Sequence, residues 1–277
     1  MTTNASRPVF AILSALVEER AGLHYGHADQ ELFLDRVTTR SDEAGFESLL
    51  DYYYFLRYDP AGPRELDELV AHLVVNETYF FRELEALRVI VTRFIQPLVS
   101  AGHRPRIWSA ACATGEEPLT LAMLLAQADL LAHVDLVASD ISQRALDSAR
   151  NGSFSRRSLR HGVDAELAQR WLREEQGRLR VAAGLIEAIE WRRVNLCNPT
   201  ETAAMGDFDV VLCRNVLIYF RDDTVVRVIE ALAARLKPGG ALFVGVSESL
   251  LRFGTALACE EADQVFYYRK VSRGLPS

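Results

Sequence analysis

The sequence lacks a membrane-spanning segment, a cysteine pattern typical of zinc sites or disulfides, and a signal peptide. None of its apolar runs approaches the ~20 residues that a membrane-spanning helix needs. Four cysteines, Cys112, Cys197, Cys213 and Cys259, form no Cys-x-x-Cys pair, which disfavours a zinc site or a disulfide framework. Residues 9–17 are apolar, but two glutamates follow them directly, so an amphipathic helix is favoured over a signal peptide. We expect a cytoplasmic protein that does not insert into membranes.

Positive charge is scarce in the first third of the chain. Residues 1–100 hold 9 arginines, no lysine and 16 acidic residues, whereas the remainder is balanced. This uneven distribution indicates two units with different surfaces. The overall formal charge of −7 disfavours a nucleic-acid-binding protein, because such domains usually carry a basic excess. A composition of 49% hydrophobic and 25% charged residues is that of a globular protein and excludes a disordered or collagen-like chain.

The spacing of apolar residues predicts an all-helical N-terminal domain over residues 1–100. Apolar side chains recur at helical intervals in residues 46–56, 66–73 and 84–98. The sequence Asp-Pro-Ala-Gly-Pro at residues 59–63 separates two of these helices.

Residues 101–277 show a different pattern, in which short apolar runs alternate with helical stretches. We expect strands at residues 107–110, 134–139, 208–213, 241–246 and 266–269, and helices at residues 118–131, 142–150 and 222–236. Alternation of this kind predicts an α/β fold with a doubly wound, mostly parallel sheet.

One segment interrupts the alternation. Residues 151–193 combine a helix expected at 164–174 with short strand-like pieces at 179–181 and 186–194. The stretch from residue 150 to 193 is basic, with 10 arginines against 6 acids. We expect a small inserted subdomain within residues 151–193.

Ligands of open α/β sheets bind beyond the carboxyl ends of the strands, which makes the residues after the strands the first candidates for a site. Residues 110–118 read Ala-Ala-Cys-Ala-Thr-Gly-Glu-Glu-Pro and contain one glycine, not a Gly-x-Gly-x-x-Gly fingerprint. Glu116 and Glu117 would repel a phosphate and suit a cation, or they would only stabilise a first helical turn. Asp140, after the next strand, is placed to bind a ribose diol or to cap a helix.

Two further segments combine polar and aromatic residues. Residues 213–220 read Cys-Arg-Asn-Val-Leu-Ile-Tyr-Phe, where Asn215 could hold a polar ligand group and Tyr219 could direct its hydroxyl into a pocket. The alternative is that the apolar members are core and Tyr219 is a rim aromatic. Residues 76–82 read Asn-Glu-Thr-Tyr-Phe-Phe-Arg and favour the wall of a site, with a capped helix start as the alternative.

The segments at residues 76–82, 111–118, 138–141 and 213–220 resemble, in order and spacing, those of the chemotaxis receptor glutamate methyltransferases, the CheR family. The resemblance extends over about residues 8–270. It implies an all-helical N-terminal domain, a Rossmann-like methyltransferase domain that binds S-adenosylmethionine (AdoMet), and a small inserted β subdomain. It also implies methyl transfer from AdoMet to glutamate side chains of a chemoreceptor or related signalling protein.

The resemblance further implies roles for individual residues. The AdoMet-binding set that it implies is Asn76, Thr78, Arg82, Glu117, Asp140, Asn195, Leu196, Arg214 and Asn215. Glu117, with Glu116 as a second candidate, would face the amino acid or sulfonium end, and Asp140 would take the ribose hydroxyls. Asn195 and Leu196 would lie near the adenine. Arg82 and Tyr219 would reach the substrate glutamate and are the catalytic candidates.

Methylation of a carboxylate makes few chemical demands on the protein. A glutamate with an unperturbed pKa of about 4.3 is already ionised at pH 7, so no general base, nucleophilic side chain or metal is required. Positioning of the reacting atoms and exclusion of water then account for catalysis. The sequence has no Asn-Pro-Pro-aromatic segment and no Pro-Cys pair, the features expected for DNA methylation.

The acidic N-terminal third departs from the family, in which a helix of that domain is commonly basic and meets acidic receptor helices. Arg36 and Arg40, one helical turn apart, could form a small basic face, or the basic 150–193 segment could assist docking. Two other functions are also weighed. A non-catalytic AdoMet-binding signalling module would not need Arg82 and Tyr219, and a small-molecule methyltransferase is disfavoured by residues 76–82.

Overall fold

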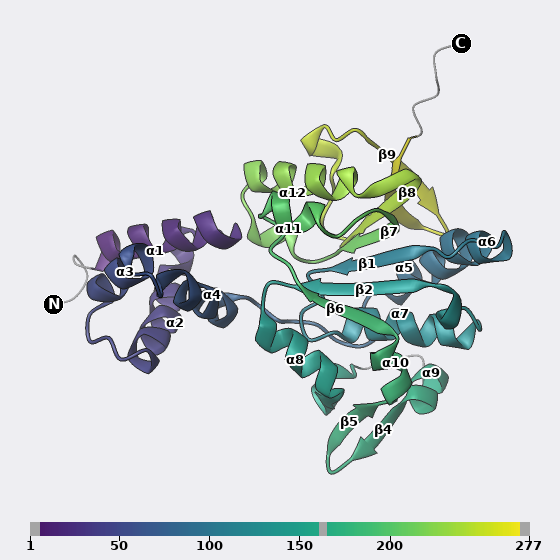
Figure 1. Ribbon diagram of the computed structural model, residues 1–277, viewed down its shortest axis with the longest axis horizontal. Helices are drawn as coiled ribbons and strands as arrows, with labels where there is room; N and C mark the ends of the chain where they lie inside the picture. The colour runs from purple at the N-terminus through teal and green to yellow at the C-terminus, as the bar shows by residue number, and fades with distance from the viewer. Residues whose placement is uncertain (1–5, 161–164, 272–277) are drawn as a thin grey trace. The chain divides into compact units, whose positions relative to one another are not determined.

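The computed structural model describes residues 6–160 and 165–271 (Figure 1). The chain divides into two compact units. The first contains residues up to Val75 together with Tyr219–Thr224, and the second contains Asn76–Ile218 and the residues from Val225 onward.

The first unit is helical. Its helices are α1 (Ser6–Ala21), the short 3-10 helix η1 (His27–Asp29), α2 (Gln30–Glu43), α3 (Leu49–Tyr58) and α4 (Gly62–Leu73). Each of α1 to α4 turns an apolar face inward, and Leu13, Phe33, Tyr52 and Leu69 are fully buried. The segment Tyr219–Thr224 joins this unit through the backbone, because the His24 N–H donates to the Tyr219 carbonyl at 2.8 Å.

A partly buried ion pair ties α2 to α4. The guanidinium group of Arg40 donates to both carboxylate oxygens of Glu65 at 2.7 and 2.6 Å, and the Tyr52 hydroxyl donates to the same carboxylate at 2.7 Å. Arg36 donates to the Leu73 carbonyl at 3.1 Å. Glu65 therefore neutralises Arg40, whereas Arg36 gives an N–H group to a backbone carbonyl and keeps its charge.

The second unit is built on a seven-stranded sheet in the order β6-β2-β1-β7-β8-β10-β9 (Figure 1). The strands are β1 (Arg106–Ala110), β2 (Asp135–Asp140), β6 (Ile189–Arg193), β7 (Phe208–Cys213), β8 (Leu236–Val244), β9 (Leu257–Ala262) and β10 (Val265–Lys270). The first five are parallel, and β10 pairs antiparallel with β8 and β9. This confirms the predicted α/β fold with a mostly parallel, doubly wound sheet.

Helices cover both faces of this sheet. They are α5 (Leu84–Val89), the π-helix η2 (Ile90–Ile95), α6 (Gln96–Ser100), α7 (Glu116–Gln127), α8 (Gln143–Asn151), α11 (Pro199–Ala203) and α12 (Asp222–Ala234), with short turns η3 (Leu131–His133), η5 (Leu217–Tyr219) and η6 (Leu251–Phe253). Ile107, Val210 and Leu212 belong to the core on the α5–α7 side. Trp108 and Val211, which alternate with them along β1 and β7, are equally buried, as expected when both faces are covered.

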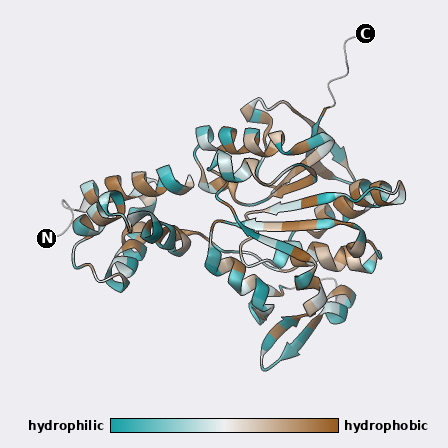
Figure 2. Ribbon diagram, in the orientation of Figure 1, coloured by the Kyte–Doolittle hydropathy of each residue, from teal (hydrophilic) through white to brown (hydrophobic). Residues whose placement is uncertain are grey.

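A second, three-stranded antiparallel sheet interrupts the alternation. It consists of β3 (Ser153–Ser155), β4 (Leu172–Glu175) and β5 (Arg178–Val181), with η4 (Arg156–Ser158), α9 (Ala165–Trp171) and α10 (Ala183–Glu187) beside it in sequence. The hydrophilic colouring of the β4–β5 hairpin in Figure 2 reflects its charged residues.

Two expected elements differ clearly from the structure, and strand β9 was not expected. The helix predicted at 164–174, whose first residue lies outside the described residues, ends at Trp171, and the chain continues as β4. Gln176 and Gly177 both have positive φ, the geometry of a tight hairpin turn, and they join β4 to β5. The strand predicted at 186–194 begins only at Ile189. β9 was not predicted, because its alternating exposed residues, Cys259 and Glu261, and the charged Glu260 leave no apolar run.

The division between the units also differs in position from the boundary predicted at residue 100. Residues 84–100 are helical as expected, but Leu87, Ile90 and Phe94 belong to the core of the sheet-containing unit. The units divide between Val75 and Asn76 instead. Helical periodicity reports the element type and not the surface against which the helix packs.

Within the described ranges, no helix has the length and apolar character needed to cross a bilayer. The same ranges hold no group of three or more His, Cys, Asp or Glu side chains arranged to bind a metal ion.

We predict that Arg40→Ala destabilises the helical unit by about 1–3 kcal/mol, because it removes charge-assisted hydrogen bonds from a largely buried carboxylate. Burial opposes ionisation of Glu65, but Arg40 and Tyr52 lower the pKa of its carboxyl overall. A carboxyl with a lowered pKa stabilises the fold above its unfolded pKa, and this stabilisation disappears as the pH falls. Urea unfolding at pH 7 and pH 4 measures both effects.

The matched control is Arg57→Ala, which removes an exposed ion pair with Glu19 and should change stability much less. Equal losses in the two variants would contradict a structural role for the Arg40–Glu65 pair.

Candidate functional site at the carboxyl ends of the parallel strands

The loop after β1 has an unusual backbone that brings it close to its neighbours. Ala111, Ala113 and Gly115 have φ values of 58°, 48° and 93°, in the left-handed region. A Cβ atom at Gly115 would lie 2.7 Å from the Cβ of Ala149 and 3.0 Å from the Trp191 ring. Glycine is therefore required at residue 115, where α7 begins against α8 and β6.

Asp140, at the end of β2, joins three of the loops. Its Oδ2 accepts from the Ala113 N–H at 2.8 Å and its Oδ1 accepts from the Ser142 N–H at 2.9 Å. Its carbonyl accepts from the Val194 N–H at 3.0 Å. Burial raises the pKa of this carboxyl, and the backbone donors partly offset that rise. An ionised carboxylate offers about four acceptor positions, so Asp140 can still receive a ligand hydroxyl.

Asn195 and Leu196 follow β6 beside Asp140, and both are buried. The Asn195 side-chain oxygen accepts from the Cys197 N–H at 2.9 Å, and the Asn195 N–H donates to Glu201 at 2.7 Å. These bonds fold residues 195–201 into a tight turn, which keeps Asn195 and Leu196 at the end of β6, next to the loop after β2.

Arg214, after β7, carries a fully buried guanidinium group between two carboxylates. Its side chain is 1% exposed, and it donates to Glu117 and to Glu83, each at 2.8 Å. It also donates to the Arg82 carbonyl at 3.2 Å. Burial opposes ionisation of Glu83, but Arg214 lowers the pKa of the Glu83 carboxyl overall. One cation thus connects the loops after β1 and β7 to the segment before α5.

The two glutamates at the start of α7 have different surroundings. Both oxygens of Glu117 are engaged, one by Arg214 and the other by the Ser109 hydroxyl at 2.8 Å. Glu116 is 2% exposed and accepts from the Thr114 hydroxyl at 2.7 Å. Burial raises the pKa of the Glu116 carboxyl. Neither acid is a freely solvated residue of a first helical turn.

The segment 76–82 is held by contacts within its own unit. Arg160 donates to Glu77 at 2.8 Å and lies 4.0 Å above the Tyr79 ring. The Phe80 N–H donates to the Ser158 carbonyl at 2.8 Å. The Phe81 N–H donates to the Thr120 hydroxyl at 3.2 Å, which ties the end of the segment to α7. Of the predicted residues near its start, Asn76 is exposed and Thr78 is half-buried.

Arg82 and Asn215 approach the Arg214 cluster from two directions. The Arg82 guanidinium donates to the Glu77 carbonyl at 3.1 Å, and its Nε lies 4.0 Å from a Glu83 oxygen. Asn215, with a φ of 59°, donates its side-chain amide to Glu83 at 3.4 Å.

Most of the predicted residues therefore form two clusters, and Asn76, Thr78 and Tyr219 lie outside them. Arg82, Glu117, Arg214 and Asn215 share one network, which includes Glu83. Another cluster contains Asp140, Asn195 and Leu196, and the loop after β1 links it to the first. Tyr219 is half-buried and belongs to the segment grouped with the helical unit.

Two carboxylates of this region were not predicted, Glu83 and Glu248. Glu248 lies beyond the end of β8 and accepts the Asn215 N–H at 2.6 Å. Its position after a strand, in Gly-Val-Ser-Glu, was the signal available in the sequence. Glu83 directly follows Arg82, but only its contact with Arg214 reveals its place.

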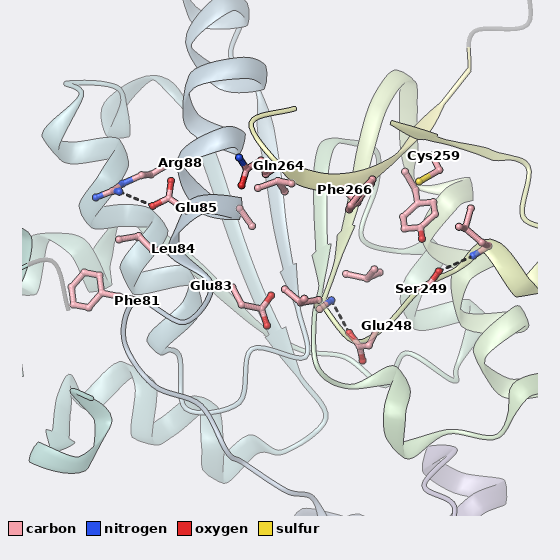
Figure 3. A pocket seen from close by; sticks show the side chains of 17 residues that line it. Phe81, Glu83, Leu84, Glu85, Arg88, Glu248, Ser249, Cys259, Gln264 and Phe266 are labelled. Carbon is pink, nitrogen blue, oxygen red and sulfur yellow. Dashed lines mark hydrogen bonds and ion pairs between the residues drawn. The ribbon is translucent and has the colours of Figure 1, made fainter. Parts of the chain in front are cut away.

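Glu83 and Glu248 lie at the same end of a cavity of about 840 Å³ (Figure 3). Exposed apolar side chains at Val246, Leu251 and Phe266 line the rest of this cavity, between α5 and the β8–β10 strands.

Comparison with known proteins identifies two matched family domains. The CheR methyltransferase SAM-binding domain matches residues 76–266, and the CheR methyltransferase all-alpha domain matches residues 8–74. These ranges meet where the structure divides.

Several curated proteins are similar over most of their length. Chemotaxis protein methyltransferase 2 of Vibrio cholerae is 32% identical, over 92% of this chain and 90% of that protein. Chemotaxis protein methyltransferase 1 of Pseudomonas aeruginosa is also 32% identical, over 89% and 92% of the two chains. The chemotaxis protein methyltransferase of Vibrio parahaemolyticus is 34% identical, over 86% and 87%.

We predict that Gly115→Ala destabilises the second unit clearly more than Gly177→Ala. Both glycines have positive φ, so each variant carries left-handed strain of about 1–2 kcal/mol. Only residue 115 adds a steric clash, because nothing lies within 4 Å of a Cβ atom at residue 177. Urea unfolding of the two variants separates strain from clash, and equal losses would show that the Gly115 loop is not tightly packed.

Proposed function

The chain belongs to the CheR methyltransferase family, and we propose that it methylates glutamate side-chain carboxylates of a chemoreceptor or related signalling protein in the cytoplasm. It is an AdoMet-dependent methyltransferase. The structural observation that carries the proposal is the buried Arg214, which joins the loops after β1 and β7 to residues 82–83 in one network.

The side chains around the strand ends fit AdoMet. This ligand has no phosphate, and it carries a sulfonium cation, an amino group and a ribose diol. The site offers the carboxylates of Glu116, Glu117 and Asp140 at the ends of β1 and β2. The loop after β1 lacks the glycines that accommodate a pyrophosphate. An acidic, phosphate-excluding loop of this kind suits a cationic cofactor.

Individual roles follow from this geometry. Asp140 would accept the ribose hydroxyls through its free lone pairs, with Asn195 and Leu196 bordering the adenine. Arg214 and Ser109 already bond the two oxygens of Glu117. Glu117 would therefore face the cationic end of AdoMet with only its remaining acceptor positions. The residues that would complete the cofactor site are Asn76, Thr78, Arg82, Arg214 and Asn215.

Bound AdoMet supplies an electrophilic methyl group on its sulfonium. The protein has to orient the acceptor carboxylate and exclude water, since opposite charges cancel as the ester forms. Arg82 would hold the carboxylate by charge-assisted hydrogen bonds, and Tyr219 would donate a further one. No proton has to be removed from an acceptor that is already ionised.

Glu65 pairs with Arg40 in the helical unit, which weakens the case for a docking face at Arg36 and Arg40. We propose that arginines of the inserted subdomain contribute instead. Arg157, Arg173 and Arg180 of this subdomain are exposed. Complementary charge of this kind mainly accelerates encounter and weakens with salt.

The first test uses methyl-labelled AdoMet and membranes that contain the receptors of the same cell. We expect label on protein that alkali releases as volatile methanol, the mark of a carboxyl ester. Arg82→Ala and Tyr219→Phe should each lower the rate by about 10- to 100-fold, since each removes an interaction that orients the acceptor. Full activity in both variants would refute their roles, and AdoMet binding without turnover would favour a non-catalytic signalling module.

The second test concerns pH. Because burial raises the pKa of Asp140, its carboxylate should lose its charge at a higher pH than an ordinary aspartate. AdoMet affinity measured by calorimetry should therefore fall as the pH is lowered through that range. Asp140→Asn should bind AdoMet more weakly at pH 7 and show a flatter pH dependence. An unchanged pH profile in this variant would exclude Asp140 from the ribose site.

A further inference from the structure

We propose that Glu248 is a positioning residue for methyl transfer, whose carboxylate fixes the chain after β7 and thereby sets the conformation of Asn215. This inference rests on the proposed function, in which Asn215 contributes to the AdoMet site.

The Glu248 carboxylate accepts four backbone N–H groups from two different segments. Oε2 accepts from Asn215 at 2.6 Å and from Gly245 at 2.8 Å. Oε1 accepts from Leu217 at 2.8 Å and from Ile218 at 3.3 Å. The Glu248 residue is only 6% exposed, and its own N–H donates to the Gly245 carbonyl at 2.8 Å. Figure 3 shows the carboxylate beneath the end of β8.

The Glu248 carboxylate supplies hydrogen-bond acceptors to the backbone just beyond the end of the β7–β8 pairing. The parallel pairing of β7 with β8 stops at Cys213 and Val244, so the next N–H groups have no strand partner. Buried N–H groups without an acceptor are costly. A carboxylate is the side chain that offers the most acceptor positions and no donor, and its bonds to N–H groups are charge-assisted. Glu248 therefore determines where residues 215–218 lie.

The conformation held in this way is an unusual one. Asn215 has a φ of 59°, which few residues other than glycine and asparagine adopt readily. Its backbone is held by Glu248, and its side-chain amide donates to Glu83 at 3.4 Å. A Cβ atom at Gly245 would lie 2.5 Å from the Asn215 Nδ2 and 2.8 Å from a Glu248 oxygen. Gly245 thus leaves the space in which the amide and the carboxylate meet.

Glu248 is assigned a positioning role because its oxygens face backbone N–H groups of its own chain. Its effect on the reaction should therefore pass through Asn215. This dependence separates positioning from general stability, because a positioning residue loses its influence once the side chain that it positions has been removed.

The test is a double-mutant cycle with Glu248→Gln and Asn215→Ala. AdoMet affinity is measured by calorimetry and methyl transfer by initial rates, so that KM and kcat are separated. The amide introduced by Glu248→Gln would turn a donor toward backbone donors. We expect each single variant to weaken AdoMet binding or lower kcat by about 10- to 100-fold. The double variant should be no worse than the more impaired single variant.

Glu190→Gln is the matched control. Glu190 is an exposed acid on β6 that accepts from Arg192, so its replacement should leave AdoMet affinity and kcat unchanged. Gly245→Ala provides a second route if Glu248→Gln does not fold. The added methyl group presses on both Asn215 and Glu248 and should reproduce the same non-additivity with Asn215→Ala.

The proposal would be overturned if the losses of the two single variants multiplied in the double variant. It would also be overturned if Glu248→Gln had the AdoMet affinity and kcat of the wild-type protein. Failure of the wild-type protein to form methyl esters would instead refute the proposed function, and the AdoMet-affinity cycle would still test Glu248.

Discussion

The buried guanidinium group of Arg214 is the interaction on which the site depends. A cation that is 1% exposed is tolerated only because Glu83 and Glu117 neutralise it from two sides. These partners belong to different parts of the chain, one before α5 and the other at the start of α7. The ion cluster therefore requires both segments to be in place together. Removing either acid would leave an incompletely compensated buried charge, which links the integrity of the site to the folding of the unit.

The pKa values of the surrounding carboxyl groups shift in opposite directions, depending on whether an arginine or backbone N–H groups contact them. Arg214 lowers the pKa of the Glu83 carboxyl in spite of burial. Burial dominates for Asp140 and Glu248 and raises the pKa of each carboxyl, although backbone N–H groups oppose the rise. Asp140 and Glu248 have the same structural task at two different strand ends. Each accepts backbone N–H groups where a parallel strand has ended, so that the loops have fixed conformations before a ligand arrives. Such preorganisation suits a reaction that needs positioning rather than proton transfer.

Much of the fold was predictable because it depends on local periodicity. The strand predicted at 208–213 has the observed limits, and the other parallel strands lie within a few residues of their predicted positions. The prediction was poorer where contacts distant in sequence decide the structure. Residues 84–100 were helical as expected but pack on the sheet, and β9 is held by its pairing with β10 rather than by an apolar run of its own. Arg36 and Arg40 formed a plausible basic pair in the sequence, yet acceptors on α4 take them both.

The sequence by itself determined the α/β class, the helical first unit and the family, and it named candidate residues after the strand ends, because each of these is written in spacing or in short contiguous motifs. Tertiary structure alone decided that Glu117 holds Arg214, that Glu83 and Glu248 contact Arg214 and Asn215, and that the units divide between Val75 and Asn76. The physical reason is that these bonds join residues far apart in the sequence: Arg214 lies 131 positions from Glu83, and Glu248 lies 33 positions from Asn215. No local pattern records which acid will neutralise a given arginine, whereas the folded chain brings the two together.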